Sequence, residues 1–214
     1  MESSNYHRQK ELYKRLNDSL SDITGINTDF LSNLTNDKLI NLKYALSDIN
    51  NIVTLKTSLA FIDYISLIFS LTPNEKLEIV DRLNSTKPNS NGYDIYFKNK
   101  NVSFFAEIKS TVPINKGTQF GIAQINSILD DAIKLQNGKR GIDTSNAYKF
   151  IGVLDLGDTT LTALKKVFRG RNIRIMNDQR DKRNKIKTHL ALIEQPKKFT
   201  DLIIDKIHVV PIKI

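Results

Sequence analysis

The segment from Gly92 to Ser110, GYDIYFKNKNVSFFAEIKS, contains two carboxylates and a lysine that a β-hairpin would bring together. Apolar and polar side chains alternate in both halves of the segment. This alternation predicts two strands, because successive side chains of a strand point to opposite faces. In the second half one face is apolar, and the other carries Glu107 and Lys109. In the first half Asp94 faces away from an apolar set that comprises Tyr93, Ile95 and Phe97.

A turn at residues 99–101, Asn-Lys-Asn, is expected to join the two strands. If Phe97 pairs with Val102, Asp94 lies diagonal to Glu107 on the same face of the sheet. Diagonal neighbours of this kind are roughly 7–8 Å apart, so the two carboxylates could share a divalent ion. A slip of one residue would turn Asp94 to the other face, so the prediction depends on the register.

The chemistry that these residue types favour is metal-assisted hydrolysis of a phosphodiester. Asp94 and Glu107 offer hard oxygen ligands of the kind that Mg²⁺ accepts, and the backbone carbonyl of Ile108 could supply another. Lys109 lies on the same side of the strand as Glu107. Its ammonium group could orient or deprotonate the attacking water and offset the negative charge that develops at phosphorus.

On these residues the sequence resembles the PD-(D/E)xK nuclease superfamily, whose members include most type II restriction endonucleases. Asp94 matches the first acid of the motif, and residues 107–109, Glu-Ile-Lys, match its second half. Tyr93 stands where the motif has proline. The resemblance covers about twenty residues. It implies an α/β (mixed α+β) fold with a restriction-endonuclease-like core, in which helices flank a mixed sheet. It also implies cleavage of double-stranded DNA with Mg²⁺ or Mn²⁺, and a homodimer.

Other interpretations of the same residues stay open. Glu107 is the only acid in the chain that is followed two places later by lysine. A solvated strand end with a cross-strand ion pair would also explain this Glu-x-Lys on its own, so the prediction depends on Asp94 as well. A structure-specific or repair nuclease, such as a junction resolvase, could use the same trio. A non-catalytic basic DNA-binding module is the alternative from another class.

The composition favours a nucleic-acid partner. The chain has 214 residues, a formal net charge of +9 and an isoelectric point near 9.6. Such a field attracts polyanions. There is no cysteine, which excludes disulfides, thiolate zinc sites and a cysteine nucleophile. The N-terminal sequence lacks the apolar core of a signal peptide, so we expect a cytoplasmic protein.

A basic segment from Arg169 to Lys187 is a second candidate for function, because its side chains could contact phosphates and read guanine edges. A solvated basic loop would explain it as well. The candidate DNA-binding residues are Arg169, Arg171, Arg174, Arg180, Lys182 and Arg183. A third acid could come from the helix expected before the hairpin, which offers Glu75, Glu78 and Asp81.

Several classes of protein are not supported. Phosphate-binding loops, dinucleotide fingerprints and a nucleophile elbow are absent from the sequence, so we expect no nucleotide cofactor. The three histidines are scattered without the spacing of metal ligands. The longest apolar stretch, Leu55 to Leu71, holds Lys56 and Asp63 and falls short of the ~20 apolar residues that span a bilayer. We therefore expect a buried helix there, which ends before Pro73. We expect no membrane partner.

The remaining pattern predicts one domain, with a helical part to about residue 72 and a catalytic core from about residue 73. Apolar periodicity and capping signals predict helices at 6–20, 37–49, 54–70, 72–83, 118–135 and 158–168. The stripe of the helix at 118–135 is expected to comprise Ile122, Ile125, Leu129 and Ala132. Residues 84–92 are expected to form a loop. Further strands are predicted at 148–156, 189–193 and 207–214, the last at an edge because of Pro211.

Overall fold

The computed structural model describes residues 7–87, 92–114, 117–139, 141–169, 178–194 and 198–214. The chain divides into two compact units, residues 1–49 and residues 50–214. The expected single domain, with a helical part to about residue 72, stays a prediction, and the boundary between the two units lies earlier, at residue 49. It falls within one long helix, because the second half of that helix packs into the core of the second unit.

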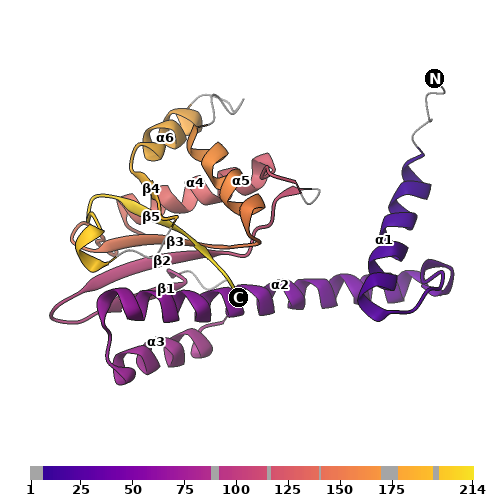
Figure 1. Ribbon diagram of the computed structural model, residues 1–214, viewed down its shortest axis with the longest axis horizontal. Coiled ribbons are helices and arrows are strands. Elements are labelled where there is room, and N and C mark those ends of the chain that lie inside the picture. Colours follow the sequence, from indigo (N-terminus) through magenta and orange to yellow (C-terminus); the bar gives the residue numbers. More distant parts are fainter. Residues whose placement is uncertain (1–6, 88–91, 115–116, 140, 170–177, 195–197) are drawn as a thin grey trace. The chain divides into compact units, whose positions relative to one another are not determined.

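The first unit is helical. Helix α1 (Arg8–Thr24) begins at His7, whose ring nitrogen Nδ1 accepts a hydrogen bond from the amide of Lys10, and ends at Gly25 with a φ of 70°. A short 3₁₀ turn, η1 (Leu31–Asn33), follows, and helix α2 begins at Asn36. These elements are coloured indigo in Figure 1.

Helix α2 (Asn36–Phe69) is continuous over 34 residues, where we expected two helices with a break near residues 50–53. The expected break is wrong because this stretch, Asn-Asn-Ile-Val, contains neither proline nor glycine to stop the helix. Among the described residues, α2 is the one helix long and apolar enough to cross a membrane by length and composition alone. Its second half nevertheless contributes buried Phe61, Ile62 and Ile65 to an apolar core, as a core helix does.

Helix α3 (Pro73–Ser85) begins with the expected capping box. The Thr72 hydroxyl accepts from the amide of Glu75, and the Glu75 carboxylate accepts from the amide of Thr72 at 2.9 Å. Proline stands at the first turn, where its missing N–H costs nothing. The helix continues to Ser85, two residues beyond its predicted end, and residues 88–91 of the predicted loop lie outside the described residues.

A five-stranded mixed sheet forms the centre of the second unit. Its order is β1-β2-β3-β5-β4; β1 and β2 are antiparallel, and the other neighbours are parallel. The strands are β1 (Ile95–Lys98), β2 (Ser103–Lys109), β3 (Tyr148–Leu154), β4 (Leu190–Leu192) and β5 (Ile207–Ile212). The helices that follow the hairpin are α4 (Ile122–Asn137), α5 (Asp158–Arg169) and α6 (Asp178–Lys187), with a 3₁₀ turn η3 (Phe199–Asp201) before β5. The predicted class, a mixed sheet flanked by helices, is confirmed.

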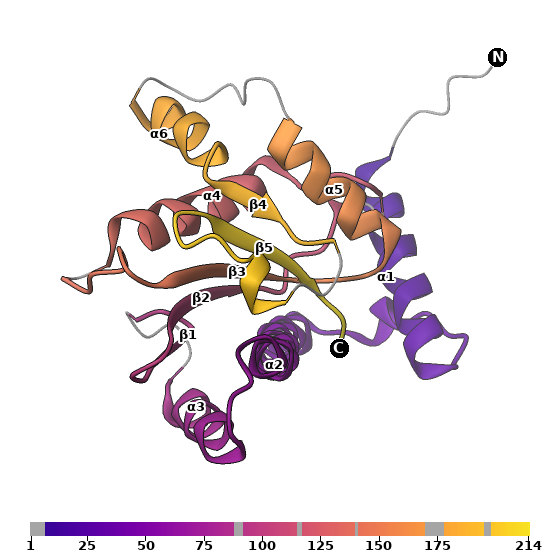
Figure 2. The same cartoon turned by 60° about the vertical axis from the view of Figure 1, so that its left-hand side comes forward.

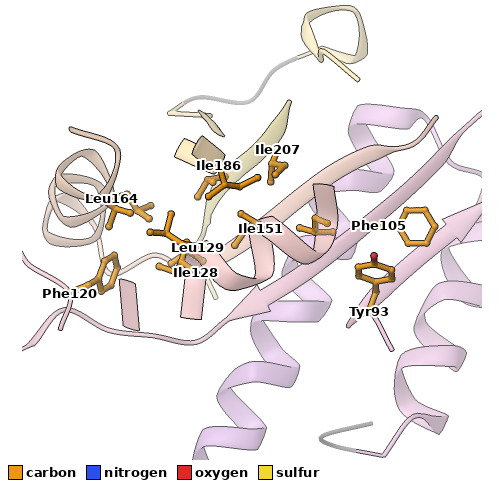
Figure 3. Packing of buried hydrophobic residues seen from close by; sticks show 14 of the residues in the cluster. Tyr93, Phe105, Phe120, Ile128, Leu129, Ile151, Leu164, Ile186 and Ile207 are labelled. Carbon is orange, nitrogen blue, oxygen red and sulfur yellow. The ribbon is translucent and has the colours of Figure 1, made fainter. Parts of the chain in front are cut away.

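Helices cover both faces of this sheet. Figure 2 shows α4, α5 and α6 on one face, and α3 with the second half of α2 on the other. Each face has its own apolar core, as expected for strands that are buried on both sides. The α4 side includes Phe105, Ile151 and Val209, with others labelled in Figure 3, and the α2 side includes Phe104 and Phe150.

Strand β5 corrects one prediction. It lies between β3 and β4, not at an edge. Proline is tolerated at position 211 because β4 pairs with β5 only from Ile207 to Val209. At Pro211 the strand is therefore paired on one side only, with Val153 of β3. The N–H that proline lacks interrupts no hydrogen bonds between β5 and β4 at this position.

Candidate active site

The turn of the β1–β2 hairpin sets the position of the candidate residues. The side-chain oxygen of Asn99 accepts from the amides of Asn101 and Val102 at 2.8 and 2.7 Å, and the amide of Asn99 donates to the Val102 carbonyl. The side-chain amide of Asn99 also donates to Glu75 of α3 at 2.6 Å. The turn is therefore held by its own residues and by the neighbouring helix.

The register of the hairpin differs from the expected one by two residues. Lys98 pairs with Ser103, and Ile95 pairs with Ala106. When the ladder is continued by one pair, Asp94 comes directly opposite Glu107 and not diagonal to it. Because the difference is an even number of residues, both carboxylates keep the same face of the sheet.

Asp94 is exposed and lies just before β1. Its carboxylate oxygen Oδ2 accepts a hydrogen bond of 2.7 Å from the backbone amide of Ile108. This bond ties the start of β1 to β2 next to Glu107. Tyr93 departs from the expected alternation: it packs against Phe105 on the α4 side, away from Ile95 and Phe97. Figure 3 shows the two rings near one another.

Glu107 is only 5 % exposed. Burial and the negative charges of Asp94 and Asp131 together raise its pKa to about 8, although the nearby ammonium group of Lys139 opposes them. The Lys139 Nζ atom lies 3.3 Å from the Glu107 carboxylate and also donates to the carbonyl of Gly92. Burial, and after it the negative charge of Glu107, raises the pKa of Tyr93 to about 12.

Lys109 is held by two groups of α4. Its ammonium group donates to the Ser127 hydroxyl at 2.9 Å and forms an ion pair with Asp131. Asp131 also pairs with Lys134 at 2.6 Å, and its side chain is only 6 % exposed. This pairing raises the pKa of Lys134.

The site therefore brings together three carboxylates and three ammonium groups. The acids are Asp94, Glu107 and Asp131, and the lysines are Lys109, Lys134 and Lys139. Among the described residues, no group of three or more Asp, Glu or His lies close enough to hold a metal ion. A metal carried by the chain would thus have two carboxylates at most from these groups, in addition to backbone oxygen and water.

Three charged residues of this site, Asp131, Lys134 and Lys139, were not predicted. The predicted stripe of α4 is confirmed at Leu129 and Ala132, which are buried, but not at Ile122, which is 63 % exposed. Ile128 and Leu135 are also buried, so the buried face extends to the side that carries Asp131. The spacing of three and four residues places Ile128, Asp131 and Leu135 on one face of the helix. An acid on this apolar face is the sequence feature that could have indicated Asp131 as a site residue. Lys139 follows the end of α4, and no pattern in the sequence indicates its position.

The acids proposed on α3 have other partners. Glu75 caps its own helix and binds Asn99, and its pKa is lowered chiefly by the backbone amide of Thr72. Glu78 pairs with Arg82 on the same helix at 2.7 Å. Asp81 is exposed. The third acid near Glu107 comes from α4, as Asp131.

The basic segment is described in part. Arg171 and Arg174 lie outside the described residues, as does the side chain of Arg180. Arg169 at the end of α5 and Lys182 in α6 are exposed. Arg183 binds both carboxylate oxygens of Asp130, at 2.8 and 2.6 Å, and its side chain is 12 % exposed. Arg183 thus fastens α6 to α4, and its role in DNA contact stays a prediction.

Comparison with known proteins adds no relative: no family model matches the chain, and no curated protein or solved structure is significantly similar to it. The argument for function therefore depends on the geometry of the site and on the charge of the chain.

Proposed function

We propose that this protein is a Mg²⁺-dependent endonuclease that hydrolyses phosphodiester bonds in double-stranded DNA, in the manner of a type II restriction enzyme. The observation that carries the proposal is the position of Asp94 opposite Glu107, on the face of the hairpin that also holds Lys109. The element order supports it, because helix α3, the hairpin, helix α4 and strand β3 follow one another as a PD-(D/E)xK core requires.

The residues of the site fit a small divalent cation. The pKa of Glu107 is raised in part because Asp94 and Asp131 place negative charge nearby, and a bound cation would relieve this repulsion. Mg²⁺ usually takes only one or two protein carboxylates and keeps several waters. Asp94 and Glu107 would hold it, with the carbonyl of Ile108 as a further ligand. Bound there, the ion would polarise the scissile phosphate and activate water for attack.

The protein's own groups would have distinct roles. Glu107 must lose its proton, and Lys139 lowers the cost of doing so by placing positive charge beside it. Lys109 would stabilise the charge that develops on the phosphate. Asp131 and Ser127 orient its ammonium group, which otherwise moves on a flexible stem.

A plasmid-cleavage assay tests the proposal. Wild-type protein with Mg²⁺ is expected to linearise or fragment supercoiled plasmid, and EDTA is expected to abolish this. Lys109→Ala should lose the activity. Lys165→Ala is the matched control, because it removes an ammonium group that is paired with Glu194 outside the site and should retain cleavage. Mapped ends at one repeated sequence would indicate a restriction enzyme, and a preference for branched substrates would indicate a structure-specific nuclease.

A non-catalytic DNA-binding module is the second candidate. It is favoured by the ion pairs of Lys109 with Asp131 and of Lys139 with Glu107, since buried pairs of this kind also occur as purely structural links. Binding of DNA that persists with Mg²⁺ and produces no cleavage on linear, supercoiled and branched substrates would favour the module.

A further inference from the structure

The described part of the first unit, residues 7–49, has no apolar core of its own. None of the residues described between 7 and 49 is buried, whereas the second unit holds two cores, one that begins at Phe61 and one that begins at Tyr93. Folding of a region must bury enough apolar surface to offset the lost chain entropy. The large apolar side chains that the first unit leaves exposed are Leu12, Tyr13, Ile23, Ile26, Leu39, Ile40, Tyr44, Leu46 and Ile49.

The start of α2 has the spacing of a helix that packs against other helices. Leu39, Leu42, Leu46 and Ile49 follow one another at intervals of three, four and three residues, which places them on one stripe. Leu46 and Ile49 are 50 % and 51 % exposed. Tyr44 lies on the other side of the helix and is 67 % exposed. One apolar stripe of this spacing is typical of a helix that packs against another helix.

Charge separates the two units sharply. Residues 1–49 carry six Lys and Arg against seven Asp and Glu, so the remaining 165 residues carry 26 against 16. The first unit therefore has a net charge of −1 and the second of +10. A DNA backbone or an anionic lipid surface would attract the second unit and not the first. Two copies of the chain would meet least repulsion through their first units.

We propose that the first unit is a dimerisation region, in which α1 and the start of α2 pack against the same surface of a second copy to form a helical bundle. A two-fold contact of this kind uses one self-complementary patch twice. A stable interface buries roughly 800 Å² of each partner. The exposed apolar side chains of α1 and of the stripe on α2, most about half exposed, supply apolar surface to such an interface. The inference depends on the first unit alone and not on the activity of the second.

The mass of the full-length protein in solution tests this inference. Wild type is expected at twice its chain mass of 24.4 kDa when sedimentation is measured at tens of micromolar. The double variant Leu46→Glu with Ile49→Glu should sediment as a monomer with an unchanged unfolding transition of the second unit. Asn41→Glu adds a charge to the polar side of the same helix and should leave the dimer intact.

Cysteine cross-linking provides a test that does not depend on charged variants. The chain has no cysteine, so each single substitution reports one contact. At least one of Leu42→Cys, Leu46→Cys and Ile49→Cys should form a disulfide-linked dimer under mild oxidation, and Asn41→Cys should not.

Three results would overturn the inference: a monomeric wild type, a double variant that stays dimeric, or binding of the monomer to neutral lipid vesicles through the same residues. A monomeric wild type that still cleaves DNA would reject the dimer and leave the proposed function standing. A dimeric wild type that does not cleave DNA would support the dimer and contradict the proposed function.

Discussion

Glu107 is a carboxylic acid in an environment that disfavours its charge. Its side chain is buried, and it faces Asp94 and Asp131 with Lys139 as the opposing cation. The folded protein therefore binds a proton at this position at pH values where the unfolded chain has already released it. Stability that depends on this proton is greatest at low pH and is lost as the pH rises toward the folded pKa.

The pH dependence of unfolding should report this carboxyl group. Between the ordinary pKa of a glutamate and about 8, the folded state holds more protons than the unfolded state. The free energy of unfolding should thus fall by roughly a few kcal/mol as the pH rises from about 5 to about 8.5, because the pKa of Glu107 is higher in the folded state. Urea unfolding of wild type and Glu107→Gln at several pH values measures it. Glu107→Gln should flatten the dependence, and an unchanged slope would reject the assigned environment.

The sequence was sufficient to find some residues of the site and not others. Asp94, Glu107 and Lys109 could be placed on one face because a strand alternates with a period of two residues, and an even error in register does not alter the face. To predict Asp131 as a site residue, one must know which side of α4 is buried. Ile122 made this side difficult to predict, because it is apolar but exposed. Lys139 reaches the site through tertiary contacts with Gly92 and Glu107 that local patterns do not contain.

At the scale of elements, α2 packs closely on the sheet where β3 carries a glycine. A Cβ atom built on Gly152 would lie 2.8 Å from the end of the Ile108 side chain and 3.1 Å from the Phe61 ring. Both side chains belong to the core on the α2 side. The absence of a side chain at position 152 thus allows α2 to approach β2 and β3.

Gly152→Ala should therefore be destabilising, by about 1–3 kcal/mol, since the new methyl group overpacks this core. Denaturant unfolding at pH 7 measures the change. Gly92→Ala is a suitable control because a Cβ there meets no atom within 4 Å and should alter the stability little. Phe61→Leu should cost less in the Gly152→Ala background than alone. Additive costs would mean that the two positions do not contact one another.

The helices and strands of the second unit were largely predictable, because their apolar periodicity agrees with their burial. The capping box at Thr72 and Glu75 fixed the start of α3. The long α2 was divided wrongly, since a polar pair such as Asn50-Asn51 does not end a helix. The residues in and around β5 do not indicate that this strand lies inside the sheet, because strand order depends on pairing between distant segments.

At the scale of the whole molecule, charge is distributed unequally along the chain. The second unit holds the candidate site and a surplus of ten positive charges, whereas the first unit is nearly neutral. Binding of a polyanion is therefore expected to involve the second unit.

Affinity for duplex DNA should depend steeply on salt. If about four phosphates are neutralised, the dissociation constant should rise roughly 100-fold between 50 and 200 mM salt, because binding releases condensed counterions. Fluorescence anisotropy of a labelled duplex in EDTA measures binding without cleavage. The unfolding midpoint over the same salt range is the control for loss of folded protein. An affinity that does not change with salt would contradict binding through this charge surplus.

The most direct test of the proposed function is the rate of plasmid cleavage by Glu107→Gln in Mg²⁺. Gln keeps the size of the side chain and removes the charge that would hold the cation, so the rate should fall at least roughly 100-fold while DNA affinity in EDTA stays close to that of wild type. Glu194→Gln, at an exposed acid paired with Lys165, should cleave at the wild-type rate. Cleavage by Glu107→Gln at the wild-type rate would contradict the assignment of this carboxylate to the metal, and with it the proposed active site.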